Sequence, residues 1–430
     1  MFAGQNALTH SRTHALLFPT PTSPVTRTLL PIIAILAAAP LGGQTRARDL
    51  GVPFDGTPGP LNAITDVAGL EVGHTTLISG AGRLRVGTGP VRTGVTAILP
   101  RGKRSSDPVF AAWFSLNGNG EMTGTTWIDE GGFLEGPVLI TNTHSVGVVR
   151  DATIQWLVTH NPAILWALPV VAETFDGPLN DINGFHVKPE HVFAALDGAR
   201  GGAVQEGSVG GGTGMMCNGF KGGIGTSSRR LAEAQGGYTV GVLVQCNYGS
   251  QYNLRIAGVP VGREITGMRI CYETAEPPSQ PYMRGVPRCA TPTASAPAPV
   301  DERDVGSIII VVATDAPLLP HQLERVVRRA ALGLARTGSI AGNGSGDIFV
   351  AFSTANPGAA RDTASVALTM LPNDRIDGVF QATVQATEEA ITNAMVAART
   401  MTGADGLRVY GLPHDRLREI LTKYNRLAPR

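Results

Sequence analysis

The chain has 430 residues, of which 43% are hydrophobic and 16% charged, so it can build a large core and does not have the composition of a disordered protein. Its 35 Lys and Arg residues nearly balance 34 Asp and Glu residues, and this formal charge of +1 argues against a dedicated nucleic-acid binder. Glycine is over-represented, at 54 residues without a collagen period, which predicts tight turns and close backbone approaches.

The N-terminal stretch is predicted to be an export signal. No Asp or Glu occurs before Asp49, and the apolar run LLPIIAILAAA (29–39) is too short to cross a bilayer. A cationic flank, a short apolar run and small residues after it are typical of a signal peptide, which we place at residues 1–44 without fixing its cleavage point. We therefore expect a periplasmic or secreted protein that is not held at the membrane after export.

From Asp49 onward, short apolar runs alternate with glycine turns and helical patterns, which predicts a mixed α/β or α+β fold. We treat residues 45–430 as a single domain. Apolar spacing predicts helices at 149–160, 319–337, 381–401 and 414–427, and buried strands at 237–249 and 306–317.

One segment, residues 273–304, breaks this pattern because it is rich in Pro, Ala, Ser and Thr and poor in long apolar side chains. Proline removes backbone donors, so the segment cannot form a central strand and is interpreted as a surface linker. It runs almost directly into Gly306, Ser307 and a buried strand. Whether the linker is trimmed stays open.

Four cysteines occur, and none has the spacing of a metal site. In an oxidising compartment Cys271 and Cys289 could pair across the loop between them. Cys217 and Cys246 lie in apolar or glycine-rich contexts and are predicted to be buried thiols. No metal and no cofactor is expected.

The usual serine-hydrolase signatures are missing, since the chain has neither a GxSxG elbow nor an SxxK motif. A nucleophile could instead be a chain-terminal Ser whose own α-amine, with a pKa of roughly 7.7–8.0, serves as the base. Such a residue must be released by a cut before it. Gly306-Ser307 suits this cut because glycine leaves its carbonyl open to attack, although Gly-Ser before a strand is by itself typical of a turn.

Three more polar residues could support such a nucleophile. Ser345 and Asp347 flank a glycine in SIAGNGSGDIFVAFS (339–353), and Asn247 closes a predicted strand where its amide could donate to an oxyanion. Taken singly, each is typical of a turn or a satisfied core residue.

Three further residues could bind substrate, although the sequence patterns around them are less specific. Trp127 and Glu130 lie close together in NGNGEMTGTTWIDEGG (117–132), and TNTHSVG (141–147) contains His144. The glycine-rich stretch 208–229 could line a pocket with backbone N–H groups. Each of these also has an ordinary structural interpretation as a turn, a cap or a core polar residue.

Taken together, these strings resemble the D-aminopeptidase/β-peptidyl aminopeptidase family of self-processing, N-terminal-nucleophile-like serine hydrolases. The strings occur in the family's order between about Gly51 and Thr354, and it is the ordered set that is specific. They are GNGEMTGTTW, ITNTHSVG, GGGTGM, FKGGIGTSSR, VLVQCNYG, GVPVGR, GSIIIVVATDAPLLP and GNGSGDIFVAFST.

The resemblance implies an αββα four-layer sandwich and a precursor that cuts itself at Gly306-Ser307, giving an α chain that ends at residue 306 and a β chain of residues 307–430. Ser307 matches the family's nucleophile, Ser345 and Asp347 match its supporting Ser-x-acid pair, and Asn247 matches its oxyanion amide. The alternative cut at Gly249-Ser250 is rejected, because the Ser-x-acid spacing fits Ser307. The linker is longer than the family's pattern.

The expected substrate is a small peptide, amide or ester with a free N-terminal L-, D- or β-amino acid, whose ammonium group Glu130 is expected to bind. The resemblance also implies a homo-oligomer of αβ units. Two alternatives stay open: an oligoamide or cyclic amide hydrolase of the same superfamily, which Ser at position 307 disfavours because that group uses Thr, and a non-catalytic exported binding protein.

Overall fold

The computed structural model describes residues 44–428, apart from residues 275, 281–282 and 290–304. The predicted signal peptide therefore lies outside the described residues except for Gln44. Within the described ranges, no helix is both long enough and apolar enough to cross a membrane.

The centre of the molecule is a six-stranded sheet in the order β4-β3-β13-β12-β10-β9. These strands are β4 (Phe133–Leu134), β3 (Val109–Gly118), β13 (Gly344–Ser353), β12 (Val305–Thr314), β10 (Thr239–Tyr248) and β9 (Gly223–Arg230). The neighbours pair antiparallel except β12 and β13, which are parallel. A parallel pair needs a crossover, and α5 (Pro320–Val327) and α6 (Ala330–Arg336) supply it. The strands predicted at 237–249 and 306–317 are confirmed as β10 and β12.

A four-stranded sheet, in the order β1-β2-β5-β6, packs against the first. Its strands are β1 (Glu71–Ser79), β2 (Val91–Leu99), β5 (Val138–Asn142) and β6 (Val170–Thr174). The core between the two sheets is apolar and includes Ile140, Ile309 and Val350. These side chains come from alternate positions of their strands, because successive strand residues face opposite sides of a sheet.

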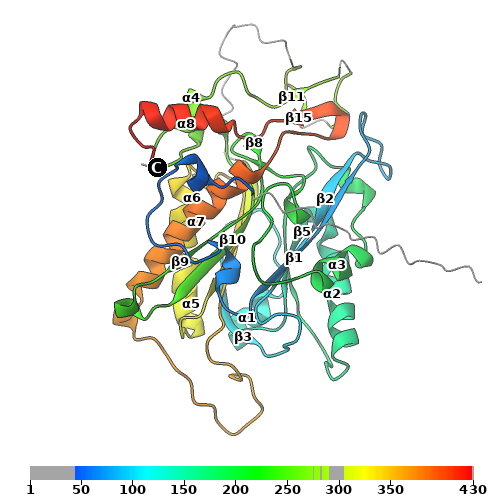
Figure 1. Cartoon of the computed structure of the whole chain (residues 1–430). Helices are drawn as coiled ribbons and strands as arrows, with labels where there is room; N and C mark the ends of the chain where they lie inside the picture. Colours follow the sequence, from blue (N-terminus) through cyan, green and yellow to red (C-terminus); the bar gives the residue numbers. More distant parts are fainter. Residues whose placement is uncertain (1–43, 275, 281–282, 290–304, 429–430) are drawn as a thin grey trace, which may run out of the picture. The chain divides into compact units, whose positions relative to one another are not determined.

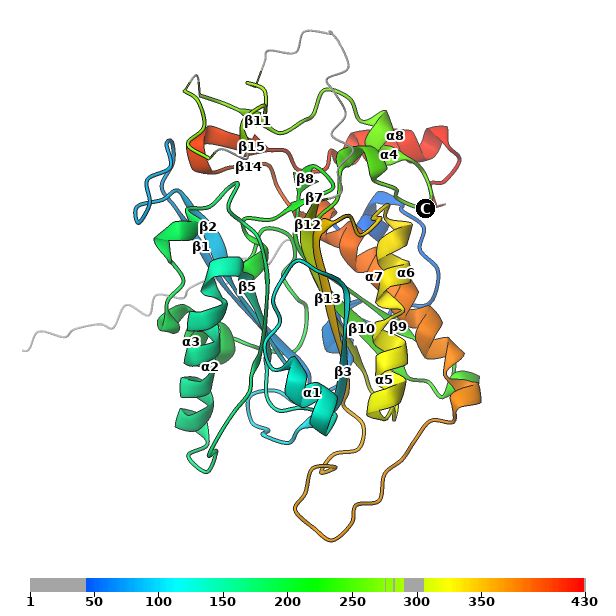
Figure 2. The ribbon, with the colours of Figure 1, turned by 180° about the vertical axis from the view of Figure 1, so that it is seen from behind.

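Helices cover the outer face of each sheet, as Figures 1 and 2 show from opposite sides. The six-stranded sheet is covered by α5, α6 and α7 (Asp377–Ala397), and the four-stranded sheet by α2 (Val146–His160) and α3 (Pro189–Asp197). This arrangement is the αββα sandwich that the resemblance implied. Three layer boundaries filled with apolar side chains make the strands at the centre rigid.

The helix predicted at 319–337 is two helices, α5 and α6. They separate at Arg328 and Arg329, where the amide of Arg329 bonds to Val326 three residues back, as in a 3₁₀ turn. The helix predicted at 381–401 begins earlier and ends at Ala397, and the C-terminal helix α8 spans His414–Lys423.

Smaller elements gather at the end of the six-stranded sheet where β12 begins (Figure 2). They are a three-stranded sheet of β11 (Cys271–Tyr272), β15 (Leu407–Val409) and β14 (Met401–Thr402), the ribbon of β7 (Met216–Cys217) and β8 (Phe220–Lys221), and α4 (Val261–Glu264). The short helix α1 (Thr125–Gly131) lies at the opposite end. Described 3₁₀ helices lie at Ala47–Leu50, Ile64–Asp66, Thr143–Ser145, Ile182–Gly184, Gly210–Gly212, Glu233–Gln235, Gln251–Asn253, Asn373–Arg375 and Ala404–Gly406.

Two disulfides fix this end of the molecule. Cys271 and Cys289 are joined, as the sequence allowed. The prediction that Cys217 and Cys246 are separate thiols was wrong: β7 lies against the end of β10, which brings their Cα atoms to 5.6 Å, within bonding range of a disulfide.

The described part of the predicted linker, within residues 273–289, is not loose. Its first residues are enclosed by the Cys271–Cys289 disulfide, and the carboxylate of Asp405 accepts hydrogen bonds from the backbone and the hydroxyl of Ser279. Gln280 is buried and donates to the carbonyl of Gly177. Composition alone suggested a solvated segment, whereas a disulfide and one aspartate hold half of it against the fold.

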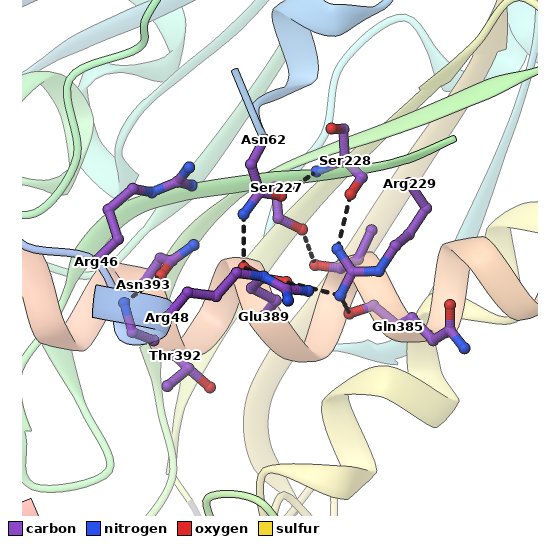
Figure 3. A network of polar contacts seen from close by, with 12 residues as sticks. Arg46, Arg48, Asn62, Ser227, Ser228, Arg229, Gln385, Glu389, Thr392 and Asn393 are labelled. Carbon is purple, nitrogen blue, oxygen red and sulfur yellow. Dashed lines mark hydrogen bonds and ion pairs between the residues drawn. The ribbon is translucent and has the colours of Figure 1, made fainter. Parts of the chain in front are cut away.

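Buried charges anchor the first described residues to α7 (Figure 3). Glu389 is fully buried and accepts hydrogen bonds from Arg48 at 2.8 Å, Arg229 at 2.7 Å and Asn62 at 2.6 Å. Burial raises the pKa of Glu389, but the bond from Arg48 and the charge of Arg229 outweigh it and hold the pKa below its usual value. Residues 46–48 are therefore an integral part of the folded domain.

Candidate active site

Ser307 lies on β12 near its start, between two other strands of the central sheet. Its Cα partner on β10 is Asn247, and its partner on β13 is Gly346. Only 3% of Ser307 is exposed. Strands on both sides therefore position the serine backbone, which is the kind of support a nucleophile needs.

Gly306 has a backbone that only glycine adopts readily. Its φ is +117°, and a Cβ built there would lie 2.0 Å from the carbonyl oxygen of Asn247. Real Cβ atoms essentially never approach another heavy atom more closely than 3.0 Å. The residue before Ser307 is thus fixed as glycine by both conformation and space.

The side chains of Ser307 and Asn247 share one face of the sheet. By strand alternation Ser307 lies on the side of Ile309 and Val311, which belong to the core between the two sheets. Asn247 has the parity of Leu243, which belongs to the same core. The nucleophile candidate and the amide candidate therefore both point into the space between the sheets.

Hydrogen bonds orient the amide of Asn247. Its Oδ1 accepts the backbone N–H of Met216 at 2.8 Å, and its Nδ2 donates to the carbonyl of Phe175 at 3.0 Å. These two partners define which atom is oxygen and which is nitrogen. A carboxamide nitrogen carries two hydrogens, so one remains to stabilise a developing negative charge.

Ser345 and Asp347 are both fully buried, and the Ser345 hydroxyl donates to Asp347 Oδ1 at 2.7 Å. Their alternation puts them on the helix-covered side of β13, with Phe349. The Cα partner of Ser345 is Gly306, so the pair flanks the Gly306–Ser307 peptide. Because its proton is committed to Asp347, the Ser345 oxygen is left as an acceptor for an N–H group.

The sequence did not single out Glu173, which lies one residue before the end of β6 in the facing sheet. It is 3% exposed, and it accepts the backbone N–H of Glu121 at 3.1 Å and the hydroxyl of Thr143. Burial raises its pKa. Gly120 links it to the nucleophile, because a Cβ on Gly120 would lie 3.2 Å from Glu173 Oε1 and 3.5 Å from the Cα of Gly346.

The signal for Glu173 in the sequence is weak. An acidic residue near the end of a strand such as VVAET is ordinary, and only the packing of one sheet on the other shows what it faces. A charge at the inner end of a buried strand is nonetheless a pattern that can be searched for.

The structure does not bring Trp127 and Glu130 to Ser307. Both are on α1, where the neighbouring Asp129 accepts a hydrogen bond from the indole of Trp113, a residue paired with Val350, well along β13 from Gly346. The indole N–H of Trp127 donates to Glu135 at 3.0 Å, and Glu130 is exposed.

His144 is closer to the site, because it follows Thr143, which bonds to Glu173. Its ring is exposed and stacks on the exposed ring of Phe185 at a centroid distance of 6.0 Å. This places an aromatic pair on the surface beside the buried carboxylate. Among the described residues, no group of three or more His, Cys, Asp or Glu side chains has the arrangement of a metal site.

Comparisons with known proteins agree with this geometry. The model of peptidase family S58 matches residues 62–409. The chain is similar to beta-peptidyl aminopeptidase BapA of Sphingosinicella microcystinivorans, with 56% identity over 92% of this chain and 96% of that protein. The corresponding protein of Sphingosinicella xenopeptidilytica is 51% identical over 91% of this chain and 94% of its own length.

Among solved structures, the L-aminopeptidase D-Ala-esterase/amidase of Ochrobactrum anthropi, described as a prototype of the serine aminopeptidases and a variant of the Ntn hydrolase fold, matches with a TM-score of 0.78. It is 46% identical, and the match covers 89% of this chain and 99% of that one. A beta-aminopeptidase from Burkholderia sp. matches with a TM-score of 0.75 and 44% identity over 90% of this chain and all of its own.

Proposed function

The chain belongs to peptidase family S58, and from this premise we propose that Ser307 is the residue with which it both cuts itself and hydrolyses substrate. It is a serine aminopeptidase of the N-terminal-nucleophile type with the corresponding variant of the Ntn hydrolase fold. The observation that carries the assignment is the register of β12, which sets Ser307 beside Asn247 and Gly306 beside Ser345.

In maturation, the Ser307 oxygen attacks the carbonyl carbon of Gly306. The C–N bond of that peptide breaks, the serine nitrogen leaves with the proton that the hydroxyl gave up, and an ester joins Gly306 to the serine oxygen. Water then hydrolyses the ester, which restores the hydroxyl and leaves a glycine carboxylate. The products are an α chain that ends at Gly306 and a β chain of residues 307–430.

In turnover, the freed α-amine of Ser307 is the base that takes the hydroxyl proton as the oxygen attacks the substrate carbonyl. The Ser345 oxygen, polarised by Asp347, accepts a hydrogen bond from that amine and orients its lone pair. The free Nδ2 hydrogen of Asn247 stabilises the oxyanion. The amine then returns the proton to the leaving group, and water repeats the sequence on the acyl-enzyme.

Glu173 is the carboxylate best placed to bind the ammonium group of the substrate. It is buried against Gly120, which also lies against Gly346, the Cα partner of the nucleophile on β13, and a cation beside Glu173 would offset the burial that raises its pKa. The earlier assignment of Glu130 to this role stays a prediction that no contact supports. An ammonium site at this depth explains why only terminal residues would be removed.

The substrates include peptides and amides that begin with a β-amino acid. The support is the resemblance to two beta-peptidyl aminopeptidases, each over more than nine tenths of this chain. A panel of p-nitroanilides of β-homoalanine, L-alanine and D-alanine tests this, since the highest kcat/KM is expected with the β-amino acid. Faster cleavage of the L-alanine compound would contradict the preference for β-amino acids and leave the proposed mechanism intact.

The protein is exported through the signal peptide at residues 1–44, and its αβ units assemble into a homo-oligomer. Two disulfides support an oxidising compartment. Exposed apolar side chains at Leu165 and Trp166 support a buried interface between units. Fractionation of the producing cells and light scattering of the purified protein test the two statements separately.

The Ser307→Ala variant tests the proposed function. It is expected to remain one chain and to hydrolyse none of the panel, while its circular dichroism spectrum stays that of the wild type. A variant that is still cut at residue 306, or that hydrolyses p-nitroanilides, would refute the assignment of the nucleophile.

A further inference from the structure

Lys221, on β8 close to the candidate site, is a buried cationic side chain to which the mechanism above gives no role. Its Nζ donates to the carbonyl oxygens of Met215 at 2.7 Å and Gly222 at 2.9 Å, with Gly212 at 3.5 Å. None of the side chain is exposed. Burying an ammonium group is costly, so its presence at this position suggests a role for the charge.

One of these bonds leads to the oxyanion amide. The carbonyl of Met215 and the N–H of Met216 belong to the same peptide group. Lys221 binds the oxygen of that peptide group, and the N–H of the same group, on Met216, donates to Oδ1 of Asn247 at 2.8 Å. The hydrogen bonds therefore run from an ammonium group through a peptide to the carboxamide of Asn247, whose second Nδ2 hydrogen is the proposed oxyanion donor.

Holding the loop in place does not by itself require this ammonium group. The disulfide between Cys217 and Cys246 joins β7 to β10, and the backbone N–H of Asn218 donates to the carbonyl of Tyr248 at 2.6 Å. The N–H of Gly222 also donates to the carbonyl of Met215 at 2.9 Å. The loop is anchored on both sides of Met216, and what Lys221 adds is positive charge at its carbonyl partners, of which Met215 is the nearest.

Positive charge at a peptide oxygen makes the N–H of the same peptide group a stronger hydrogen-bond donor. A stronger hydrogen bond to Oδ1 of Asn247 in turn makes its Nδ2 hydrogens stronger donors. Burial acts in the opposite direction on the lysine itself. It lowers the pKa of Lys221 to about 7, while the carboxylate of Asp176 favours the charged form.

We infer that Lys221 is a positioning residue for oxyanion stabilisation, acting through the Met215–Met216 peptide on the amide of Asn247. The inference rests on the proposed function, because it assumes that Asn247 stabilises the oxyanion. It requires that Lys221 has no effect on the reaction once the Asn247 amide is gone, which a double-mutant cycle measures.

The size of the effect follows from two magnitudes. A single oxyanion donor is worth about 10²–10³ in rate, and cooperative polarisation strengthens a hydrogen bond by about 10–30%. If Lys221→Met removes about 10–30% of these two to three powers of ten, its reaction rate should fall about two- to eightfold. KM should stay unchanged, because ground-state substrate carries no oxyanion.

The cycle compares wild type, Lys221→Met, Asn247→Ala and the double variant as freshly synthesised precursors, with the self-cleavage rate followed by intact mass. Self-cleavage needs no earlier maturation, so slow variants are measured directly. We expect Lys221→Met to slow cleavage two- to eightfold in the wild-type background and to have no effect in Asn247→Ala. After full maturation, the same variant should show the loss in kcat and not in KM.

Phe220→Leu is the matched control, because Phe220 is a fully buried neighbour on β8. It should lower the melting temperature and leave the cleavage rate within twofold. Lys221→Gln takes the place of Lys221→Met in the cycle if the methionine variant does not fold, since it removes the charge and keeps a polar side chain.

The outcomes distinguish a failure of the Lys221 inference from a failure of the proposed function. Equal slowing by the lysine variant with and without the Asn247 amide, or no slowing at all, overturns the inference and leaves the proposed function intact. A normal cleavage rate in Asn247→Ala itself overturns the oxyanion assignment, and the inference falls with it.

Discussion

Replacing Gly306 with Ala should slow self-cleavage strongly even though the nucleophile is unchanged. A Cβ at this position would lie 2.0 Å from the Asn247 carbonyl oxygen and needs at least 3.0 Å, so β12 and β10 must separate by about 1 Å at the cut site. The φ of +117° adds a backbone cost of ~1–3 kcal/mol, and the forced contact adds about as much again. A misplacement of ~1 Å lowers the rate of a positioned reaction about 10²-fold.

The assay is the rate at which freshly synthesised Gly306→Ala precursor converts into two chains, followed by intact mass. We expect a rate at least ~10²-fold below that of the wild type. The control is Gly267→Ala, because Gly267 also has a positive φ, of +78°, but a Cβ there meets no atom within 4 Å. It carries the backbone cost without the clash and should cleave at the normal rate. Cleavage of Gly306→Ala at the wild-type rate would refute the view that close contact with β10 holds the scissile peptide.

Three further predictions concern the surrounding groups. Ser345→Ala should lower kcat by about 10²-fold, because the α-amine loses its hydrogen-bond acceptor. Asp347→Asn should shift the acidic limb of the pH–rate profile. Unchanged kcat and an unchanged pH–rate profile in both variants would exclude the pair from the reaction. Glu173→Gln should raise KM about tenfold or more for substrates with a free amino group, because it removes the charged partner of the substrate ammonium. Glu130→Gln should leave KM unchanged, and equal effects of the two variants would contradict the proposed ammonium site. Burial raises the pKa of Asp176 to about 7, so the stability that its protonated form contributes is lost as the pH rises from about 4 to 7. In the uncut Ser307→Ala background, the free energy of unfolding of Asp176→Asn should therefore rise relative to that of its parent by about 3 kcal/mol between pH 5 and pH 8, and a constant difference would argue against a buried, perturbed carboxyl.

Those parts of the fold that depend on local pattern were predictable. Continuous apolar runs marked β10 and β12, and 3.6-residue spacing marked α2, α7 and α8 to within a few residues. The break between α5 and α6 was not, because Arg328 and Arg329 keep helical backbone angles and only the hydrogen-bond pattern changes.

The site was also predictable from the sequence only in part. Gly306, Ser307, Ser345 and Asp347 lie on two neighbouring strands, and their spacing along the chain already resembled a known family. The geometry then supplied what spacing could not, namely a positive φ at Gly306 and a register that sets Ser345 beside the scissile peptide.

Contacts between distant segments were missed. Glu173 reaches the site from the facing sheet, and Cys217 meets Cys246 across a separation of 29 residues because β7 folds back on β10. The composition of residues 273–304 suggested a free linker, yet Asp405, more than 120 positions later, binds Ser279. No local pattern encodes such pairings, because they depend on how the layers pack.

N-terminal sequencing combined with intact mass of the purified, active protein addresses the central claim most directly. The account predicts two polypeptides, with the smaller one beginning at Ser307 and running to Arg430. Fully active material that is a single polypeptide across positions 306 and 307 would contradict it, because no free α-amine would then exist at the proposed nucleophile.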